Sequence, residues 1–363
     1  MMHFKRTVIV ILLLTVAVGF APVAIAQTDE EVDLQALYQE IDDAINHSKH
    51  YVTMRESQID ACRDSLMNEQ SLENRVAKAG RLFRLFQPYK NDSALHYAEL
   101  CISLADSLHR PDIAGRFHAL MAYQCSNCNM YSESFDQLRK VNKSALDQAG
   151  LVDYYNALMH VYGELGAYTQ IKDIRRHYFD MQDLYRDSVM MVAKEGSEDW
   201  LHLKMDILSA RHSFQEALKI NNQWLKAVYP NTHESAYAAF YRSVVYDQLQ
   251  NHDQKCYWLG RSALEDIRCA VMNQASLLFL AEQLADDGDI DRARRYMEFT
   301  RDCNSVFCPY ARIYQTEPYI NILEKSCQAA EAKTDRMLII AAVVVGLLLM
   351  ALIVVIIRKK KQK

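Results

Sequence analysis

An uncharged apolar stretch near the end of the chain places the strongest constraint on its fold. Residues 337–357 read MLIIAAVVVGLLLMALIVVII and contain no charged side chain. A helix rises ~1.5 Å per residue, so this stretch matches the ~30 Å hydrocarbon core of a bilayer. The alternative is a buried core helix, but such helices rarely lack a polar face. The sequence therefore predicts a transmembrane helix over residues 337–357.

The two ends of the chain predict the orientation of that helix. Residues 1–26 combine a basic start, a short apolar run and the small-residue pattern Ala24-Ile25-Ala26, which is typical of a secretory signal peptide. A retained anchor is the alternative, but the apolar run is short for a full span. A basic tail, residues 358–363, follows the apolar stretch, and positive charge marks the cytoplasmic side. We expect a single-pass protein of the inner (cytoplasmic) membrane with a periplasmic N-terminal part and a cytoplasmic tail.

The charge of the intervening part argues against nucleic acid as its partner. Seven of the 41 basic residues lie in the signal peptide and the tail, and none of the 46 acidic residues does. Residues 27–336 therefore carry a net charge of −12. An acidic surface does not favour binding to phosphates, so we expect this chain to contact no nucleic acid.

The nine cysteines predict no disulfide framework, because an odd number cannot all pair within one chain. Cys125 with Cys128 and Cys303 with Cys308 are the two close pairs. Neither has the strand–helix context of a redox CxxC motif or further ligands at zinc spacing. Free or buried thiols are the favoured state, and a local bridge at one pair is the alternative.

Composition and periodicity predict an all-α fold. The chain has only ten glycines and six prolines, and good helix formers dominate. Apolar residues recur at helical spacing in the first part of the exported region, so we expect N-terminal capping helices in residues 27–70. From there to residue 330 we expect tetratricopeptide-like helical repeats, with residues 307–327 as the cap at the other end.

The repeat is clearest over residues 275–297. Two apolar stripes flank the turn Gly288-Asp289-Ile290, and small alanines stand where the helices would cross. The residues that correspond to Ile290 in weaker copies are Asn91, Tyr131, Tyr168, Phe214 and His252. Self-similarity at a fixed period is typical of stacked helical hairpins, and an irregular helical bundle is the alternative. The sequence predicts a helical-hairpin solenoid.

Motifs that would indicate catalysis or cofactor binding are absent from the sequence. It contains no glycine-rich phosphate loop, no H-E-x-x-H and no G-x-S-x-G. His47 and His50 could share a helix face but lack further ligands, and residues 286–289 (DDGD) read as an acidic turn rather than a calcium loop. We expect no catalytic residues, no metal site, no cofactor and no enzyme activity. An enzyme whose site is assembled from separated repeats is the remote alternative.

A stacked array of hairpins offers a concave surface lined by the first helix of each pair. Polar and aromatic side chains on such a surface suit a protein or peptide partner, which we expect on the periplasmic side. The tyrosines among them have packing between repeats as an equally good interpretation. The residues expected on this surface are Arg116, Tyr123, Asp153, Asn156, His160, Tyr237 and Phe240.

Several runs resemble a family of uncharacterised membrane proteins of Bacteroides-type bacteria. They are residues 262–268 (SALEDIR), 273–277 (NQASL), 288–290 (GDI), 296–299 (YMEF) and 92–97 (DSALHY). The resemblance covers nearly all of the chain. It implies a signal peptide, a periplasmic tetratricopeptide region and one transmembrane helix. Longer members are implied to continue into the cytoplasm with a coiled coil and a helix-turn-helix-like segment, as suspected transcription regulators.

The present sequence has no such segment after Lys363. It is therefore expected to be a truncated form, to act through a cytoplasmic or membrane regulator, or to lie outside the family's regulatory role. We interpret the protein as a membrane-anchored periplasmic repeat protein that binds a protein or peptide in transmembrane signalling. A structural scaffold or assembly factor for an envelope complex is the alternative.

Overall fold

The computed structural model describes residues 32–308 and 312–361, and this part of the chain is built from helices without strands. The predicted signal peptide, residues 1–26, lies outside the described residues. The all-α prediction is confirmed. The helices are α1 (Leu34–Asn46), α2 (Ser48–Met67), α3 (Leu72–Phe86), α4 (Asn91–Ser107), α5 (Pro111–Ser126), α6 (Tyr131–Arg139), a 3-10 turn η2 (Lys143–Ala145), α7 (Gln148–Tyr168), α8 (Lys172–Val192), α9 (Glu198–Ala210), α10 (Phe214–Ala227), α11 (His233–Gln248), α12 (His252–Arg268), α13 (Ala275–Asp287), α14 (Ile290–Phe307) and α15 (Arg312–Lys361).

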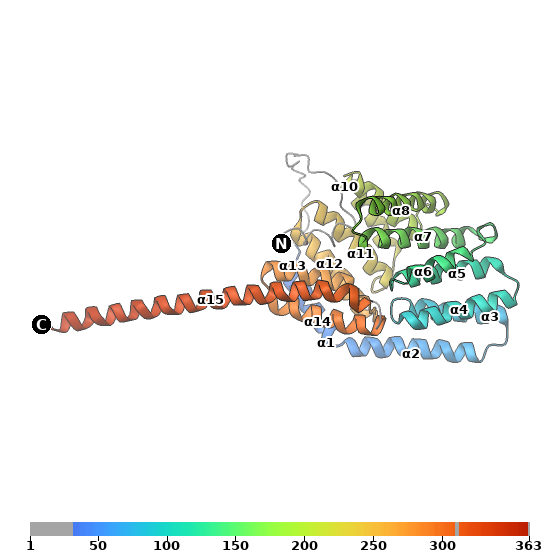
Figure 1. Cartoon of the computed structure of the whole chain (residues 1–363). Coiled ribbons are helices and arrows are strands. Elements are labelled where there is room, and N and C mark those ends of the chain that lie inside the picture. The colour runs from blue at the N-terminus through green and yellow to red at the C-terminus, as the bar shows by residue number, and fades with distance from the viewer. Residues whose placement is uncertain (1–31, 309–311, 362–363) are drawn as a thin grey trace.

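Helices α3 to α14 form six consecutive antiparallel hairpins that stack into a solenoid (Figure 1). Each hairpin buries the apolar stripes of its two helices against each other and against the next pair. Alanines that are fully buried occupy the close crossings, because a larger side chain would hold the backbones apart. They include Ala98, Ala122, Ala157, Ala217, Ala263, Ala281 and Ala293.

Five of the six predicted anchor positions begin the second helix of a hairpin. Asn91, Tyr131, Phe214, His252 and Ile290 are the first residues of α4, α6, α10, α12 and α14.

The exception is Tyr168, which is the last residue of α7 rather than the first of α8. A second helix was expected to begin at Tyr168, but the chain continues as helix through Gly166, which lies in the last turn of α7. A Cβ at Gly166 would come within 2.8 Å of the Phe179 ring on α8. Gly166 therefore allows two long helices to approach each other, and the length of α7 and α8, 21 residues each, explains the long spacing before Phe214.

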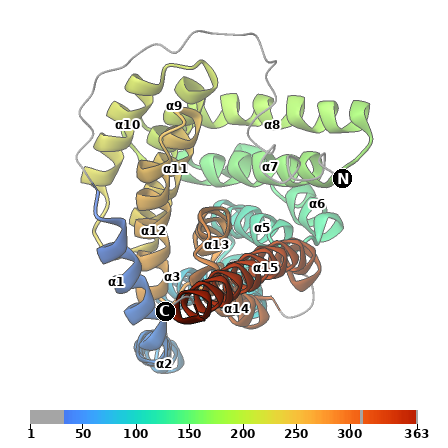
Figure 2. The same cartoon turned by 90° about the vertical axis from the view of Figure 1, so that its left-hand side faces the viewer.

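The solenoid turns back on itself, so its first helices meet its last. The backbone N–H of Met272, after α12, donates to the carbonyl of Pro88 in the α3–α4 turn at 2.8 Å. Arg55 on α2 donates to the carbonyl of Cys269 at 2.6 Å. One hydrophobic core joins residues of α2 to α5 with Met272 and Phe307. We call α1–α14, joined in this way, the closed superhelix (Figure 2).

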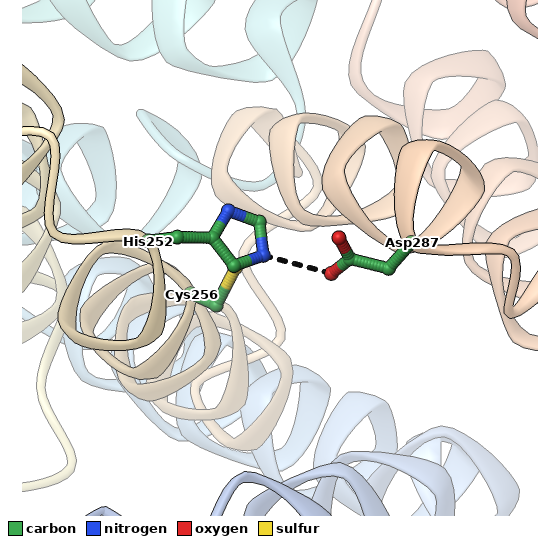
Figure 3. A group of neighbouring side chains, drawn as sticks. All are labelled: His252, Cys256 and Asp287. Atoms are coloured by element: carbon green, nitrogen blue, oxygen red, sulfur yellow. Dashed lines mark hydrogen bonds and ion pairs between the residues drawn. The ribbon is translucent and has the colours of Figure 1, made fainter.

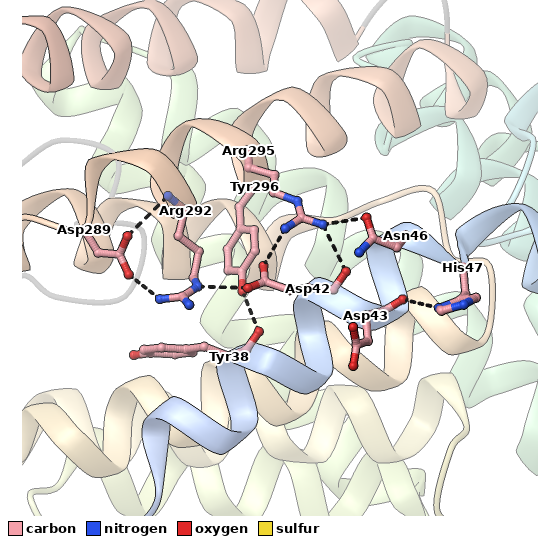
Figure 4. Close-up of polar contacts among 9 residues, drawn as sticks. All are labelled: Tyr38, Asp42, Asp43, Asn46, His47, Asp289, Arg292, Arg295 and Tyr296. Atoms are coloured by element: carbon pink, nitrogen blue, oxygen red, sulfur yellow. Dashed lines mark hydrogen bonds and ion pairs between the residues drawn. The ribbon is translucent and has the colours of Figure 1, made fainter.

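Helix α1 holds the two ends of the superhelix together. It packs on α12 at Gly260, where a Cβ would lie 2.7 Å from a methyl group of Leu37. On the α14 side, Asp42 accepts from Arg292 at 3.2 Å and pairs with Arg295 at 3.3 Å (Figure 4). The predicted N-terminal cap thus covers the first repeat through α2 and also binds the last repeats through α1.

Helix α15 leaves the superhelix as a long projection (Figure 1). Its Ile320, Leu323 and Cys327 are buried in the same core as α1, α12, α13 and α14. Ion pairs from α14 to α15 join Arg294 to Glu331 at 2.6 Å. Beyond them, the large apolar side chains from Met337 to Met350 are exposed. In the described part of the chain, α15 is the one helix long and apolar enough to cross a membrane, over Ile320–Ala351.

Candidate functional site

A cavity of about 1140 Å³ lies where the N-terminal helices meet the last repeats. Helices α2 and α3 form one wall, and α11, α12 and the start of α13 form the other. The cavity exists because the superhelix closes, since its two walls are about 200 residues apart in the chain. Its volume exceeds the ~300–1,000 Å³ of common small-molecule pockets.

Arginines concentrate on the α2–α3 wall. Arg55, Arg81 and Arg84 line the cavity there, and Arg268 lines it from the opposite side. Arg55 is fixed by its bond to the Cys269 carbonyl, and burial lowers the pKa of its guanidinium. Arg81 and Arg84 are exposed and have no hydrogen bond or ion pair with any residue of the described ranges. This wall is therefore positively charged in a protein that is acidic as a whole.

A coupled histidine and carboxylate lie on the facing wall. His233 Nδ1 lies 2.8 Å from Oδ1 of Asp266, which is buried. Burial alone would lower the pKa of His233, but the charge and hydrogen bond of Asp266 outweigh it and the pKa is raised. Burial also raises the pKa of Asp266. The pair therefore holds a proton more readily than either group does in water.

Aromatic side chains complete the facing wall. The Tyr237 ring packs edge-on against Trp224 at 5.8 Å, and its hydroxyl lies 3.2 Å from that of Tyr241. Burial raises the pKa of Tyr237, so its hydroxyl stays protonated. Phe240 stacks on Phe279 of α13 at 6.0 Å between ring centres. These contacts hold two rigid aromatic faces at the cavity.

The seven residues predicted for the concave surface divide into two groups. Tyr123, Tyr237 and Phe240 line the cavity, and the other four, Arg116, Asp153, Asn156 and His160, do not. The second group joins neighbouring first helices, although packing between repeats had been considered only for the tyrosines.

Ion pairs, hydrogen bonds and ring contacts connect the first helices of neighbouring hairpins. Arg116 on α5 pairs with Asp153 on α7 at 2.5 Å, although burial raises the pKa of Asp153. Asn156 on α7 donates to Asp199 on α9 at 2.7 Å. His160 on α7 packs on Tyr123 of α5, with ring centres 4.2 Å apart. Tyr123 therefore belongs to both groups, because it contacts the next repeat and also lines the cavity.

The arginines of the cavity were missed by the sequence analysis. Arg55 lies in the segment interpreted as a cap, and Arg81 and Arg84 lie on the first repeat, outside the second to fifth copies that supplied the prediction. Only the closure of the superhelix places them opposite α11. Basic residues clustered in an otherwise acidic chain could have indicated this site, but the three arginines lie on two different helices and form no cluster in the sequence.

Comparison with known families gives a match over residues 45–318 to the family model for the SusR N-terminal TPR domain. The chain belongs to the SusR N-terminal TPR domain family. The match runs from the end of α1 into α15, so it includes both walls of the cavity. A search of curated proteins finds no match to the chain. TPR domains are typically non-catalytic modules that bind proteins, which agrees with the expected helical-repeat interaction protein.

A separate cluster of potential metal ligands, His252, Cys256 and Asp287, lies between the start of α12 and the end of α13 in this SusR-type TPR domain (Figure 3). His252 Nε2 lies 2.8 Å from Oδ2 of Asp287 and 3.5 Å from Sγ of Cys256. The three ligand atoms are all within 4.8 Å of one another. No metal site was expected from the sequence, where these three residues were not considered together. Asp287 follows His252 by 35 residues, and only the packing of α13 on α12 brings them close.

Proposed function

We propose that this SusR-type TPR protein is a single-pass receptor of the inner membrane, whose periplasmic superhelix binds a segment of a polypeptide in the cavity. The observation that carries the proposal is the composition of the cavity, with unpaired arginines on one wall and rigid aromatic rings on the other. Helical-repeat proteins bind extended or helical segments in this way, through side chains on their inner helices.

The two walls favour a segment that carries both an apolar and an acidic group. Guanidinium groups bind carboxylates through paired hydrogen bonds, so Arg81 and Arg84 suit an acidic side chain or a carboxyl terminus. Tyr237 and Phe240 supply large apolar contact area at little cost in conformational entropy. The volume of about 1140 Å³ suits a short segment rather than a folded domain.

The position of α15 supports a role in signalling. Its residues Ile320, Leu323 and Cys327 share a core with α1, α12 and α14, which are the elements that close the superhelix. A ligand that changes how α1 packs on α12 and α14 would therefore displace the N-terminal part of α15, the helix that we propose to cross the membrane. A cytoplasmic or membrane-bound regulator is the proposed receiver. Assembly of an envelope complex remains the alternative, and it would use the same cavity without transmission through α15.

Two exposed methionines of α2 give a matched test of the binding site. Met54 lines the cavity, whereas Met67, on the same helix and 72 % exposed, does not. We expect a photo-crosslinking amino acid at position 54 of the full chain to capture a protease-sensitive species in cell envelopes, and the same group at position 67 to capture none.

Charge reversal at the arginines sharpens this test. Because Arg81 and Arg84 are exposed, Arg81→Glu with Arg84→Glu is expected to abolish capture at position 54 without lowering the melting temperature. Equal capture at positions 54 and 67 would place the interface outside the cavity. A protease-resistant adduct of small mass at position 54 would contradict the proposal and show that the cavity binds a small molecule instead of a polypeptide.

A further inference from the structure

We propose that His252, Cys256 and Asp287 bind a zinc ion where the start of α12 lies beside the end of α13. His252 and Cys256 are one helical turn apart at the start of α12, so they project from the same face. Asp287 is the last residue of α13, and the left-handed turn at Gly288 ends the helix so that its carboxylate faces them (Figure 3). The site is independent of the cavity and of the function proposed for it.

The three ligand atoms lie within 4.8 Å of one another, close enough to bind one ion after small shifts of the exposed side chains. Zinc binds nitrogen at about 2.0–2.1 Å, oxygen at about 2.0–2.2 Å and sulfur at about 2.3 Å, which sets two ligands of one ion about 3.3–3.6 Å apart. The His252–Cys256 distance of 3.5 Å already has this value. The His252–Asp287 distance of 2.8 Å is that of a hydrogen bond and opens by about half an ångström when the ion replaces the shared proton.

The charges of the ligands balance those of the ion. Zinc binds a thiolate, so the proton of the Cys256 thiol passes to solvent when the ion enters. The proton that His252 Nε2 shares with Asp287 moves through solvent to Nδ1 of the neutral ring, which leaves the Nε2 lone pair for the ion. Thiolate and carboxylate together supply two negative charges against the two positive charges of zinc. No oxidant or reductant is involved.

Access and ligand type both favour zinc. The Cys256 side chain is buried, but those of His252 and Asp287 are 45 % and 46 % exposed, which gives the ion a path from solvent and leaves a fourth position for water. Imidazole, thiolate and carboxylate together are characteristic ligands of zinc, whereas magnesium and calcium prefer oxygen alone. An ion here would join two neighbouring hairpins at the surface.

Cobalt provides the decisive measurement, because a cobalt–thiolate bond has its own near-ultraviolet absorption band. We expect the purified full chain, stripped of metal in detergent, to bind one equivalent of Co²⁺ with this band, and Zn²⁺ to displace it and raise the melting temperature. Cys256→Ser should remove the band. Cys269→Ser, which changes a partly exposed thiol outside the cluster, should leave it unchanged.

Asp287→Asn keeps the proposal testable if loss of the buried thiol impairs folding. This residue is exposed, so the variant should fold normally and bind Co²⁺ at least tenfold more weakly, in line with loss of a zinc ligand. Absence of a thiolate band in the wild-type chain would overturn the proposal. So would a band that survives in Cys256→Ser or an affinity that is the same in Asp287→Asn.

Discussion

Four of the six turns inside the hairpins depend on single residues with left-handed backbone geometry. Gly288 ends α13 with a φ of 89°, and Asn129, His212 and Gln250 occupy the same position after α5, α9 and α11 with φ between 58° and 62°. In each turn the following N–H bonds to a carbonyl five residues back, as from Asp289 to Leu284 at 2.9 Å. This bond closes the helix and directs the chain into the next one.

Replacement of Gly288 tests this geometry. Gly288→Val should lower the free energy of unfolding by about 1–2 kcal/mol, because a β-branched residue is strained at positive φ. Gly288→Asn is the control, since asparagine already holds this geometry at Asn129 and should retain most of the stability. Thermal denaturation of the full chain distinguishes the two. Equal losses would mean that the turn is not held in the left-handed conformation.

His202 predicts a pH dependence of stability. Burial lowers its pKa to about 4, and its ring lies between Trp224, Tyr237 and Tyr241. The unfolded chain binds a proton at this residue below pH ~6.5, and the folded chain does so only near pH 4. Stability is therefore lost as the pH falls through this window, by up to about 2 kcal/mol at pH 5.

His202→Phe should remove this loss while keeping an aromatic ring in place. The measurement is the change in melting temperature between pH 7.5 and pH 5.0, which should be larger for the wild-type protein than for the variant. Buried carboxyls such as Asp266, whose pKa is raised by burial, act in the opposite direction but are present in both proteins. The same change in both would show that His202 is protonated without cost.

At this scale the sequence predicted positions better than roles. Helical spacing was used to place Tyr123, Tyr237 and Phe240 on first helices; they lie on α5 and α11 and line the cavity. It also placed Arg116 and Asn156 on inner helices, but their partners on the next repeat were not identified. The distance between Asn156 and Asp199 depends on how α7 and α9 stack, which no local pattern encodes.

Among the elements, α1 has a role that its own sequence does not reveal. Its apolar stripe was correctly identified as one face of a helix, and Leu37, Tyr38 and Ile41 are buried. The stripe could equally have covered a free end of the solenoid. The decisive residues are Arg292 and Arg295 on α14, about 250 residues further along the chain (Figure 4).

Neighbouring carboxylates on α1 allow a matched test of this contact. Asp42→Ala should destabilise the protein by about 1–2 kcal/mol, because it removes the carboxylate that Arg292 and Arg295 share and leaves Arg292 with Asp289 alone. Asp43 is exposed, and its backbone carbonyl alone contacts His47, so Asp43→Ala should change stability by less than about 0.5 kcal/mol. Hydrogen exchange should also quicken across α1 in the first variant. Unchanged amide exchange in α1 would show that Asp42 does not hold α1 against α14.

For the whole molecule, the proposed topology leads to a direct prediction. A reporter that is active only in the cytoplasm should be active when fused after Lys363 and inactive when inserted in residues 193–197, the loop that joins α8 to α9. The reason is the apolar surface of α15 with basic residues at its end, together with the acidic superhelix. The reverse pattern would contradict the orientation and with it the proposed receptor.

The repeat architecture could be predicted from sequence, but the closure of the superhelix could not. Anchor residues such as Phe214 and Ile290 mark where helices begin, because each hairpin repeats the same local pattern. Curvature accumulates from small rotations between neighbouring hairpins, and these rotations depend on side-chain packing at every crossing. These rotations add up until Arg55 on α2 faces α11 and α12, and the cavity forms between them.

The contact between α1 and α14 also has a consequence for the way the chain acquires its structure. An open repeat array can fold one unit at a time, because each unit needs only its neighbours. Here α1, which precedes the other helices of the described part of the chain, finds its partners Arg292 and Arg295 only after α14 has been synthesised. Joining residues so far apart costs chain entropy that local pairing avoids. The protein should therefore fold and unfold as a single cooperative unit, and residues 34–46 should reach their native packing only after the last hairpin has formed.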